Sequence, residues 1–141
     1  MRHFHLSGGD ENGPHGEVDE VHLFLYPFAQ ERFWDLIGKD LPDRFSAVIL
    51  KQCCEGISYL HGKGLIHRDI KPANMTVVSR SPSRFIIIDF GVATWETTST
   101  NHMVGTIRYL APEVLALKRK TSTTSYNQSV DVWGLGVSFY Q

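Results

Sequence analysis

The chain has 141 residues, of which 42% are hydrophobic, and its formal net charge is -1 at pH 7. This length fits a single domain with a modest core, and the nearly neutral charge argues against binding to nucleic acid through a basic face. No apolar run approaches the roughly 18 residues of a spanning helix, and residues 1–9 lack a signal-peptide apolar core, so we expect no membrane insertion and an intracellular location, in the cytoplasm or the nucleus.

The first predicted element is a hairpin with a long polar connection. Residues 2–6 alternate weakly in polarity, residues 21–25 form a strand candidate, and residues 8–14 between them are rich in turn formers. The glycines in this connection do not follow the G-x-G-x-x-G spacing of a phosphate-binding loop. The histidines His3, His5, His15 and His22 lack a regular ligand spacing, so we expect no metal site at these residues.

Two helices are predicted next. Residues 30–37 form a short helix candidate, with Phe33, Trp34 and Ile37 at roughly helical intervals. A longer helix is expected to begin at Asp40 as its N-cap residue and to end at residues 61–64. Its buried face repeats every three or four residues and is apolar except at one position. This face comprises Phe45, Val48, Ile49, Gln52, Cys53, Gly56, Ile57 and Leu60.

The chain's two cysteines, Cys53 and Cys54, are adjacent within this predicted helix. Neighbouring side chains on a helix point to different faces. A disulfide framework is therefore excluded, and a reducing compartment fits better.

Polar residues are concentrated in the loop 67–74, His-Arg-Asp-Ile-Lys-Pro-Ala-Asn, in which Pro72 disfavours a helix. Apolar runs at 75–78 and 85–88 predict a second hairpin. The polar stretch 94–102 is expected to be mobile. After a further polar insert, residues 130–140 are predicted to form an apolar helix.

Four separated segments together resemble the protein kinase family in both identity and order. They are His67 to Asn74, Asp89-Phe90-Gly91, Gly105-Thr106 with Ala111-Pro112-Glu113, and Asp131-Val132-Trp133 with Leu135-Gly136. The resemblance implies an α+β fold, mainly the helical large lobe of a kinase with short β-hairpins, and most of the small lobe missing. Residues 1–20 would be a partial small-lobe strand with a polar connection, and residues 21–141 a fragment of the kinase domain.

The resemblance also implies a reaction, the ATP-dependent phosphorylation of serine and threonine hydroxyls on protein substrates, with ATP and Mg²⁺ as cofactors. Asp69 would accept or orient the hydroxyl proton, Lys71 would meet the transferred phosphate, and Thr106 would line the acceptor site. Asn74 and Asp89 would hold Mg²⁺, which prefers oxygen ligands.

Nucleotide contacts are implied around the connector 25–28. Leu25 would guard the back pocket, the backbone of Tyr26 to Phe28 would hydrogen-bond the adenine, and Thr76 stands where the family usually places a large aliphatic residue beneath it.

Structural and regulatory roles are implied as well. His67 and Phe90 would pack behind the site, Asp131 would hydrogen-bond the backbone of the catalytic loop, and Glu113 has no evident partner. Arg68 before the catalytic acid implies control by a phosphate on the activation segment, residues 89–113, at Ser99 or Thr100. A flexible, unmodified polar loop is the alternative.

No glycine-rich loop, strand lysine or partner glutamate precedes the connector. We therefore expect a truncated, inactive fragment of a parent serine/threonine kinase. The alternative is a non-catalytic, kinase-like binding module. A small-molecule phosphotransferase is disfavoured by Arg68 and by Ala111-Pro112-Glu113. The protein substrate and the oligomeric state stay open.

Overall fold

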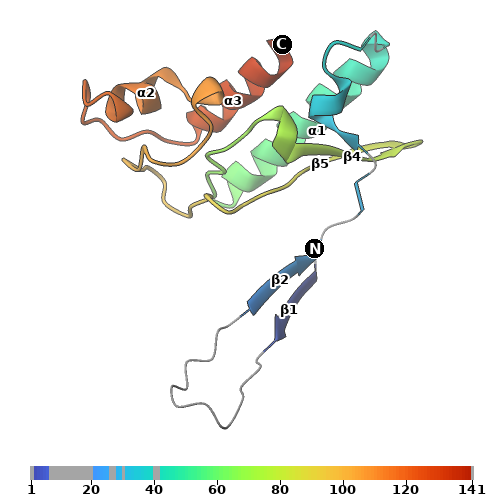
Figure 1. Ribbon diagram of the computed structural model, residues 1–141, viewed down its shortest axis with the longest axis horizontal. Coiled ribbons are helices and arrows are strands. Elements are labelled where there is room, and N and C mark those ends of the chain that lie inside the picture. Colours follow the sequence, from blue (N-terminus) through green and yellow to red (C-terminus); the bar gives the residue numbers. More distant parts are fainter. Residues whose placement is uncertain (1, 7–20, 26–27, 30, 40–41, 141) are drawn as a thin grey trace.

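The computed structural model describes residues 2–6, 21–25, 28–29, 31–39 and 42–140. Figure 1 shows the helices and the β4–β5 hairpin together in one body, while β1 and β2 lie apart from it. Within the described residues, helices combine with small antiparallel sheets, which confirms the α+β class. No helix in this part of the chain is both long and apolar enough to cross a membrane.

The N-terminal hairpin is confirmed. Strand β1 (Arg2–Leu6) pairs antiparallel with β2 (Val21–Leu25), from Arg2 opposite Leu25 to Leu6 opposite Val21. The polar connection predicted between them lies outside the described residues.

The helix predicted over residues 30–37 is wrong. Strand β3 (Glu31–Arg32) is followed instead by the 3₁₀ helix η1 (Phe33–Leu36), and Gln30 lies outside the described residues. Glu31 and Arg32 pair with Val77 and Thr76, so tertiary pairing competes with helix formation here. Phe33 and Leu36 are buried three residues apart, which is the 3₁₀ period.

The long helix α1 spans Asp43–Gly62. Its N-cap residue is Pro42, so the predicted cap at Asp40 is wrong, and Asp40 itself lies outside the described residues. Proline suits a helix N-terminus because it has no N–H to leave without a partner there. Gly64, with φ +80°, follows the helix end as predicted.

The predicted second hairpin is confirmed, and its strands extend further into the polar connection than expected. Strand β4 (Met75–Arg80) lies between β3 and β5 (Ser83–Ile87) in an antiparallel sheet. Gln52, the polar exception on the buried face of α1, donates to the Ser83 carbonyl and accepts from the Phe85 N–H, both at 2.9 Å. One side-chain amide thus joins α1 to the outer strand of the sheet.

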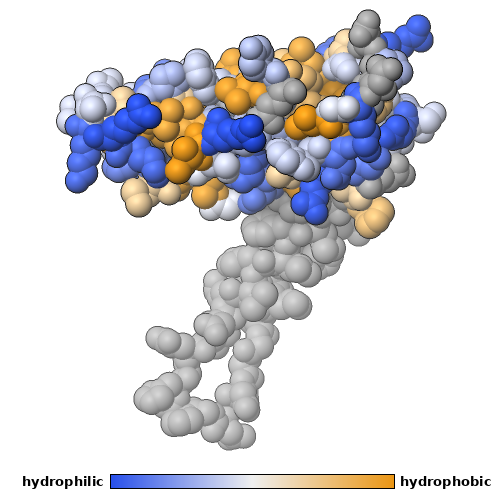
Figure 2. Space-filling view, turned by 45° about the horizontal axis from the view of Figure 1, so that its top comes forward, coloured by the Kyte–Doolittle hydropathy of each residue, from blue (hydrophilic) through white to orange (hydrophobic). Residues whose placement is uncertain are grey.

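The buried core has two parts. One joins α1, η1, β4, β5 and α3 (Ser129–Tyr140), and it includes Ile49, Cys53, Ile57, Met75, Val77 and Leu135. The other surrounds α2 (Pro112–Lys118) and includes Ile66, Leu110, Val114, Leu117, Tyr126 and Val130. Exposed hydrophobic residues are visible among hydrophilic ones on the face shown in Figure 2.

The polar stretch 94–102, which we expected to be mobile, is anchored at two points. Thr94 exchanges a pair of 2.9 Å backbone hydrogen bonds with Ile66, and Ser99 does the same with Tyr126. Burial of Tyr126 in the second core part fixes where this stretch lies.

Candidate active site

The loop 67–74 is fixed through the backbone at its start. Asp131, in the first turn of α3, accepts from the N–H of His67 and the N–H of Arg68, both at 2.8 Å. His67 is fully buried, and its ring stacks at a tilt against Phe90, with 5.0 Å between centroids. Both contacts join elements far apart in the sequence, so the loop has little freedom to move.

Hydrogen bonds define the tautomer of His67. Its Nε2 lies 3.1 Å from the Ile88 carbonyl, which can only accept, so Nε2 carries the proton. Nδ1 then accepts from the N–H of Asp69 at 3.3 Å. Burial lowers the pKa of His67 and outweighs the carboxylates around it, which keeps the ring neutral in this arrangement.

The Asp69 carboxylate is the centre of the site. It lies 2.7 Å from the ammonium of Lys71, and it accepts from the Thr106 hydroxyl at 2.8 Å and from the Asn74 amide at 3.1 Å. Lys71 also donates to Thr106 at 2.8 Å. Burial acts to raise the pKa of Asp69, but these hydrogen bonds and the charge of Lys71 outweigh it and hold the pKa below its ordinary value.

Asn74 has a second contact that fixes its orientation. Its amide nitrogen also donates to the Asp69 carbonyl at 2.9 Å. Because the nitrogen faces Asp69, the amide oxygen is the atom left to bind a cation.

Asp89 lies two residues after the end of β5. The N–H of Ile88 donates to the Asn74 carbonyl at 2.9 Å, and the charges of Asp69 and Asp89 both act on the ring of His67. The Ile88 hydrogen bond joins the end of the catalytic loop to the residue directly before Asp89. Asp89 is exposed and has φ 64°, a left-handed conformation that aspartate adopts more readily than most residues.

No group of three or more His, Cys, Asp and Glu side chains in the described part of the chain could hold a metal ion by itself. Mg²⁺ is commonly bound through only one or two protein oxygen ligands together with phosphate oxygens and water. The Asn74 amide oxygen and the Asp89 carboxylate fit that need.

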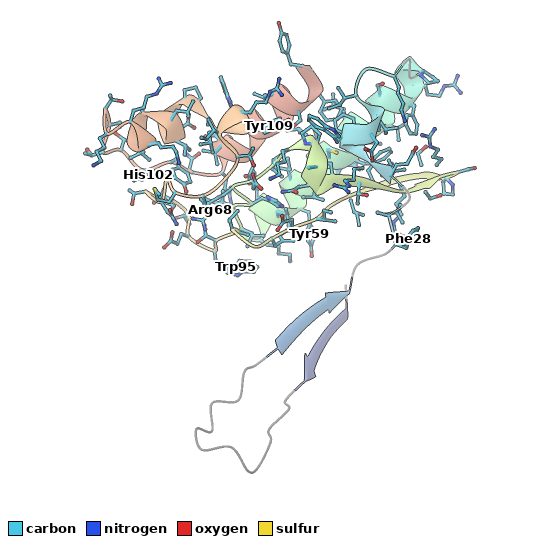
Figure 3. The ribbon with its side chains drawn as sticks, viewed as in Figure 1. Phe28, Tyr59, Arg68, Trp95, His102 and Tyr109 are labelled. Atoms are coloured by element: carbon cyan, nitrogen blue, oxygen red, sulfur yellow. The ribbon has the colours of Figure 1, made fainter. Side chains whose placement is uncertain are left out.

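Arg68 also has a left-handed backbone, with φ 67°. Such a conformation is uncommon for arginine and persists where surrounding contacts enforce it. Here Asp131 binds its N–H, and its side-chain Nε donates to the Val92 carbonyl. Figure 3 shows Arg68 on the same side of the body as Trp95 and His102 of the following segment.

Of the residues predicted to contact the adenine, the structure describes Leu25, Phe28 and Thr76. Leu25 lies on β2, and Tyr26 lies outside the described residues. Phe28 is 86% exposed (Figure 3). Thr76 is buried and donates its hydroxyl to the Glu31 carbonyl at 2.8 Å, so its predicted place beneath an adenine stays a prediction.

Of the predicted regulatory residues, Ser99 is buried and Thr100 is exposed. Both line a polar pocket of about 460 Å³ that also includes Arg68. Glu113, for which the sequence shows no arginine partner, accepts a 3.4 Å hydrogen bond from the Ser129 hydroxyl.

Sequence reasoning missed His61, whose Nε2 lies 2.9 Å from Asp131. It also missed the carbonyls of Ile88 and Val92 as partners of His67 and Arg68. Backbone carbonyls leave no signal in a sequence, and His61 was interpreted only as part of a helix end.

The loop 67–74 and the segment containing Thr106 meet at the Asp69 carboxylate. The sequence pattern of the protein kinase domain family matches residues 16–141 of this chain. The chain belongs to the protein kinase family.

Similar kinases come from several eukaryotes. The chain is 42% identical over 94 residues to a probable serine/threonine-protein kinase, fhkC, of Dictyostelium discoideum, covering 65% of this chain and 15% of that protein. It is 37% identical over 120 residues to a putative mitogen-activated protein kinase 14C of Drosophila melanogaster, covering 85% of this chain and 32% of that protein. It is 34% identical over 125 residues to mouse mitogen-activated protein kinase 13, covering 87% of this chain and 32% of that protein.

The chain thus spans less than a third of the length of each of these kinases. All three names describe serine/threonine or mitogen-activated protein kinases.

Proposed function

We propose that this chain carries the catalytic loop of a serine/threonine protein kinase, which transfers a phosphoryl group from ATP to hydroxyl groups on protein substrates. One observation carries the proposal: Asp69 is bonded at once by Lys71, Asn74 and Thr106. A carboxylate with a purely structural role would not need an ammonium group, an amide and a hydroxyl as simultaneous partners.

The lowered pKa of Asp69 keeps its carboxylate ionised at neutral pH. An ionised carboxylate can accept a hydrogen bond from a substrate hydroxyl and aim its oxygen at the phosphorus. The Thr106 hydroxyl occupies one Asp69 oxygen at 2.8 Å, which fixes the carboxylate plane. Lys71 supplies a positive charge beside it, suited to the phosphate being transferred.

Asn74 and Asp89 would hold the metal. When bound, Mg²⁺ neutralises phosphate charge and ATP supplies the phosphoryl group. Leu25, the backbone of Tyr26 to Phe28, and Thr76 are the residues we propose for adenine contact. The exposed position of Phe28 is consistent with contact through its backbone.

A polypeptide acceptor is favoured by the surface next to Thr106. Met103 is 76% exposed and Ile107 is 65% exposed, so two large apolar side chains flank the residue that binds Asp69. Exposed apolar side chains beside a polar site suit a partner that buries them. A small polar acceptor has no such surface to offer.

Regulation by phosphorylation is proposed at Thr100 or Ser99, paired with Arg68. The pocket of about 460 Å³ that these residues line is polar and open, and an arginine can bind a phosphate through more than one N–H. Thr100 is the more accessible acceptor, because Ser99 is buried and bonded through its backbone to Tyr126.

We further propose that residues 1–20 are a partial small-lobe strand with its connection and that residues 21–141 are the large-lobe part. The 141 residues contain no glycine-rich loop or strand lysine before Leu25. On their own they are therefore expected to bind ATP weakly and to transfer no phosphate.

Two assays test the proposal. The first adds Mn²⁺, a paramagnetic substitute for Mg²⁺, to the 141-residue chain with ADP and follows the backbone NMR signals. Selective broadening at Asn74 and Asp89, abolished by Asp89→Asn and retained in the control Asp35→Asn, is expected. Asp35 is an exposed carboxylate in η1.

The second assay measures phosphate transfer from ATP to a serine/threonine peptide library by the protein expressed from its own gene. Transfer that depends on Mg²⁺ and is lost in Asp69→Asn is expected. If neither metal binding nor transfer is found, the phosphotransfer assignment fails and the non-catalytic binding module is the function that remains.

A further inference from the structure

The part of the chain around Thr106 carries an excess of positive charge that the proposed chemistry does not use. Between residues 102 and 125 there are four lysine and arginine side chains and one carboxylate, that of Glu113. One cation lies in the 3₁₀ helix η3 (Ile107–Tyr109), and three lie together at the end of α2. We call this set the cationic rim, and its members are Arg108, Lys118, Arg119 and Lys120.

The protein itself does not neutralise the cationic rim. Among the described residues, no carboxylate lies within ion-pair distance of any of its members. Glu113 accepts instead from the Ser129 hydroxyl and lines the groove on α3. Arg108, Arg119 and Lys120 are exposed. Charges of one sign without counter-charges raise the local potential and attract a partner of the opposite sign.

The end of α2 is held against the segment that leads to Thr106. The ammonium nitrogen of Lys118 lies 3.4 Å from the carbonyl of His102, which precedes Thr106 by four residues. Arg108 follows Thr106 by two residues. The cationic rim therefore has members next to both ends of the short segment 102–108, and this segment binds Asp69 through Thr106.

The cations at the end of α2 lie on a fixed backbone. The N–H of Lys120 donates to the Leu117 carbonyl at 3.0 Å, and the N–H of Thr121 donates to the Ala116 carbonyl at 2.9 Å. Lys120 has φ 58°, so a left-handed residue closes the helix end.

Favourable interaction with the carbonyl end of α2 accounts for some of these cations through stability alone. Lys118 and Arg119 lie where the helix dipole favours positive charge. Arg108 lies before α2 begins, so the same effect gives no reason for a cation there. An exposed arginine two residues from Thr106, without an acidic partner, is better explained by a ligand.

We propose that the cationic rim binds acidic side chains of the protein substrate, so that the preferred acceptor hydroxyls lie in sequences rich in aspartate and glutamate. The inference rests on the proposed function, which places the acceptor hydroxyl beside Asp69. Arg108 binds carboxylates close to that hydroxyl, and the end of α2 binds more distant ones. The exposed Met103 and Ile107 between them favour a protein over a nucleic acid, as does the net charge of -1.

The experiment is an NMR titration of the 141-residue chain with two peptides. Each peptide contains one serine, flanked by glutamates in the first peptide and by glutamines in the second. The rim variant, Arg108→Gln with Arg119→Gln, removes two charges from the cationic rim. The matched control, Lys39→Gln with Arg44→Gln, removes two charges from exposed positions before and at the start of α1.

We expect the glutamate peptide to shift the amide signals of residues 107–109 and 118–121. It should bind the wild type about fivefold more tightly than the glutamine peptide, the scale of two exposed ion pairs. This preference should shrink as salt is added, disappear in the rim variant and persist in the control. Arg108→Lys with Arg119→Lys keeps both charges and should keep the preference.

Equal affinity of the wild type for the two peptides would overturn the inference, and so would the same preference in the rim variant and in its control. A single-stranded oligonucleotide that shifts the same amides and binds more tightly than the glutamate peptide would also overturn it, because the cationic rim would then be a nucleic-acid surface.

These titrations need no phosphate transfer, so they separate the inference from the proposed function. In the transfer assay, an active protein that prefers peptides without acidic residues would overturn the inference and leave the proposed function intact. Absence of any transfer would count against the proposed function alone.

Discussion

The hydroxyl of Thr106 donates a 2.8 Å hydrogen bond to Oδ1 of Asp69, across 37 residues of sequence. The same hydroxyl accepts from Lys71 at 2.8 Å. The Thr106 hydroxyl therefore bridges the Lys71 ammonium group and the Asp69 carboxylate. These two groups also lie 2.7 Å apart. The hydroxyl oxygen of Thr106 thus links the segment after Gly105 to the catalytic loop.

Replacing Thr106 by valine should remove both hydrogen bonds while keeping the shape of the side chain. We expect a loss of about 1 kcal/mol in the free energy of unfolding and a rise in the pKa of Asp69, since one of the bonds that lower it disappears. Urea denaturation and carboxyl NMR titration measure the two effects. Thr106→Ser keeps the hydroxyl and should behave like the wild type. An unchanged Asp69 titration in Thr106→Val would contradict the bond.

The lowered pKa of His67 makes stability depend on pH in one direction. Below the ordinary histidine pKa of about 6.5, the unfolded chain binds a proton that the folded chain excludes. Stability is thus fully present above that pH and is lost as the pH falls toward the lower folded pKa.

His67→Phe, which keeps a ring against Phe90 but cannot titrate, should flatten the change in unfolding free energy between pH 7 and pH 5.5. Urea midpoints of both proteins at the two pH values test this. An equal slope in variant and wild type would mean that other histidines carry the dependence.

The adjacent cysteines should react very differently. Burial and the neighbouring charge of Cys54 raise the pKa of the Cys53 thiol to about 12, and its sulfur contacts Met75 at 3.5 Å, whereas Cys54 is exposed. Since the thiolate is the reactive form, a disulfide reagent should label one thiol in the native protein and both in denaturant. Cys54→Ser should abolish the native reaction, and Cys53→Ser should leave it unchanged.

Two glycines on α3 make a matched pair. A Cβ on Gly134 would lie 2.8 Å from the Ile70 carbonyl, whereas a Cβ on Gly136 would meet nothing within 4 Å. Gly134→Ala should therefore destabilise the protein by about 1–3 kcal/mol, and Gly136→Ala should stabilise it by about 0.5–1 kcal/mol. Thermal unfolding of both variants measures the difference, and a Gly134→Ala protein as stable as Gly136→Ala would show that α3 does not press on the loop.

Exposed apolar residues on α3 should limit solubility. Val132 is 58% and Tyr140 is 93% exposed, and they line an apolar groove of about 720 Å³ with Trp133 and Val137. Val132→Lys with Tyr140→Lys should raise the concentration at which light scattering first increases. A matched control, Leu50→Lys on α1, adds charge outside the groove and should change it little.

The features predicted correctly are those with a local pattern. The three- and four-residue spacing from Phe45 to Leu60 specified the buried face of α1, and two apolar runs specified β4 and β5. Residues 31–36 were misassigned because Phe33 and Leu36 fit an α-helix and a 3₁₀ helix almost equally, and pairing with Val77 decided between them.

The site shows the same division. The family resemblance singled out Asp69, Asn74 and Thr106 by residue type and order, and the structure brings these three side chains into contact. The motifs could not identify His61 or the carbonyl of Val92, since those contacts depend on where α1 ends and where the chain passes after Gly91. Long-range geometry of this kind leaves no local pattern in the sequence.

The amide of Gln52 occupies backbone groups of Ser83 and Phe85 on an edge strand. Edge strands offer unpaired groups to strands of other molecules. A neighbouring chain that tried to extend this sheet beyond β5 would first have to displace Gln52 and uncouple the hairpin from α1. Gln52 thus occupies two of the backbone groups through which another chain could pair with β5.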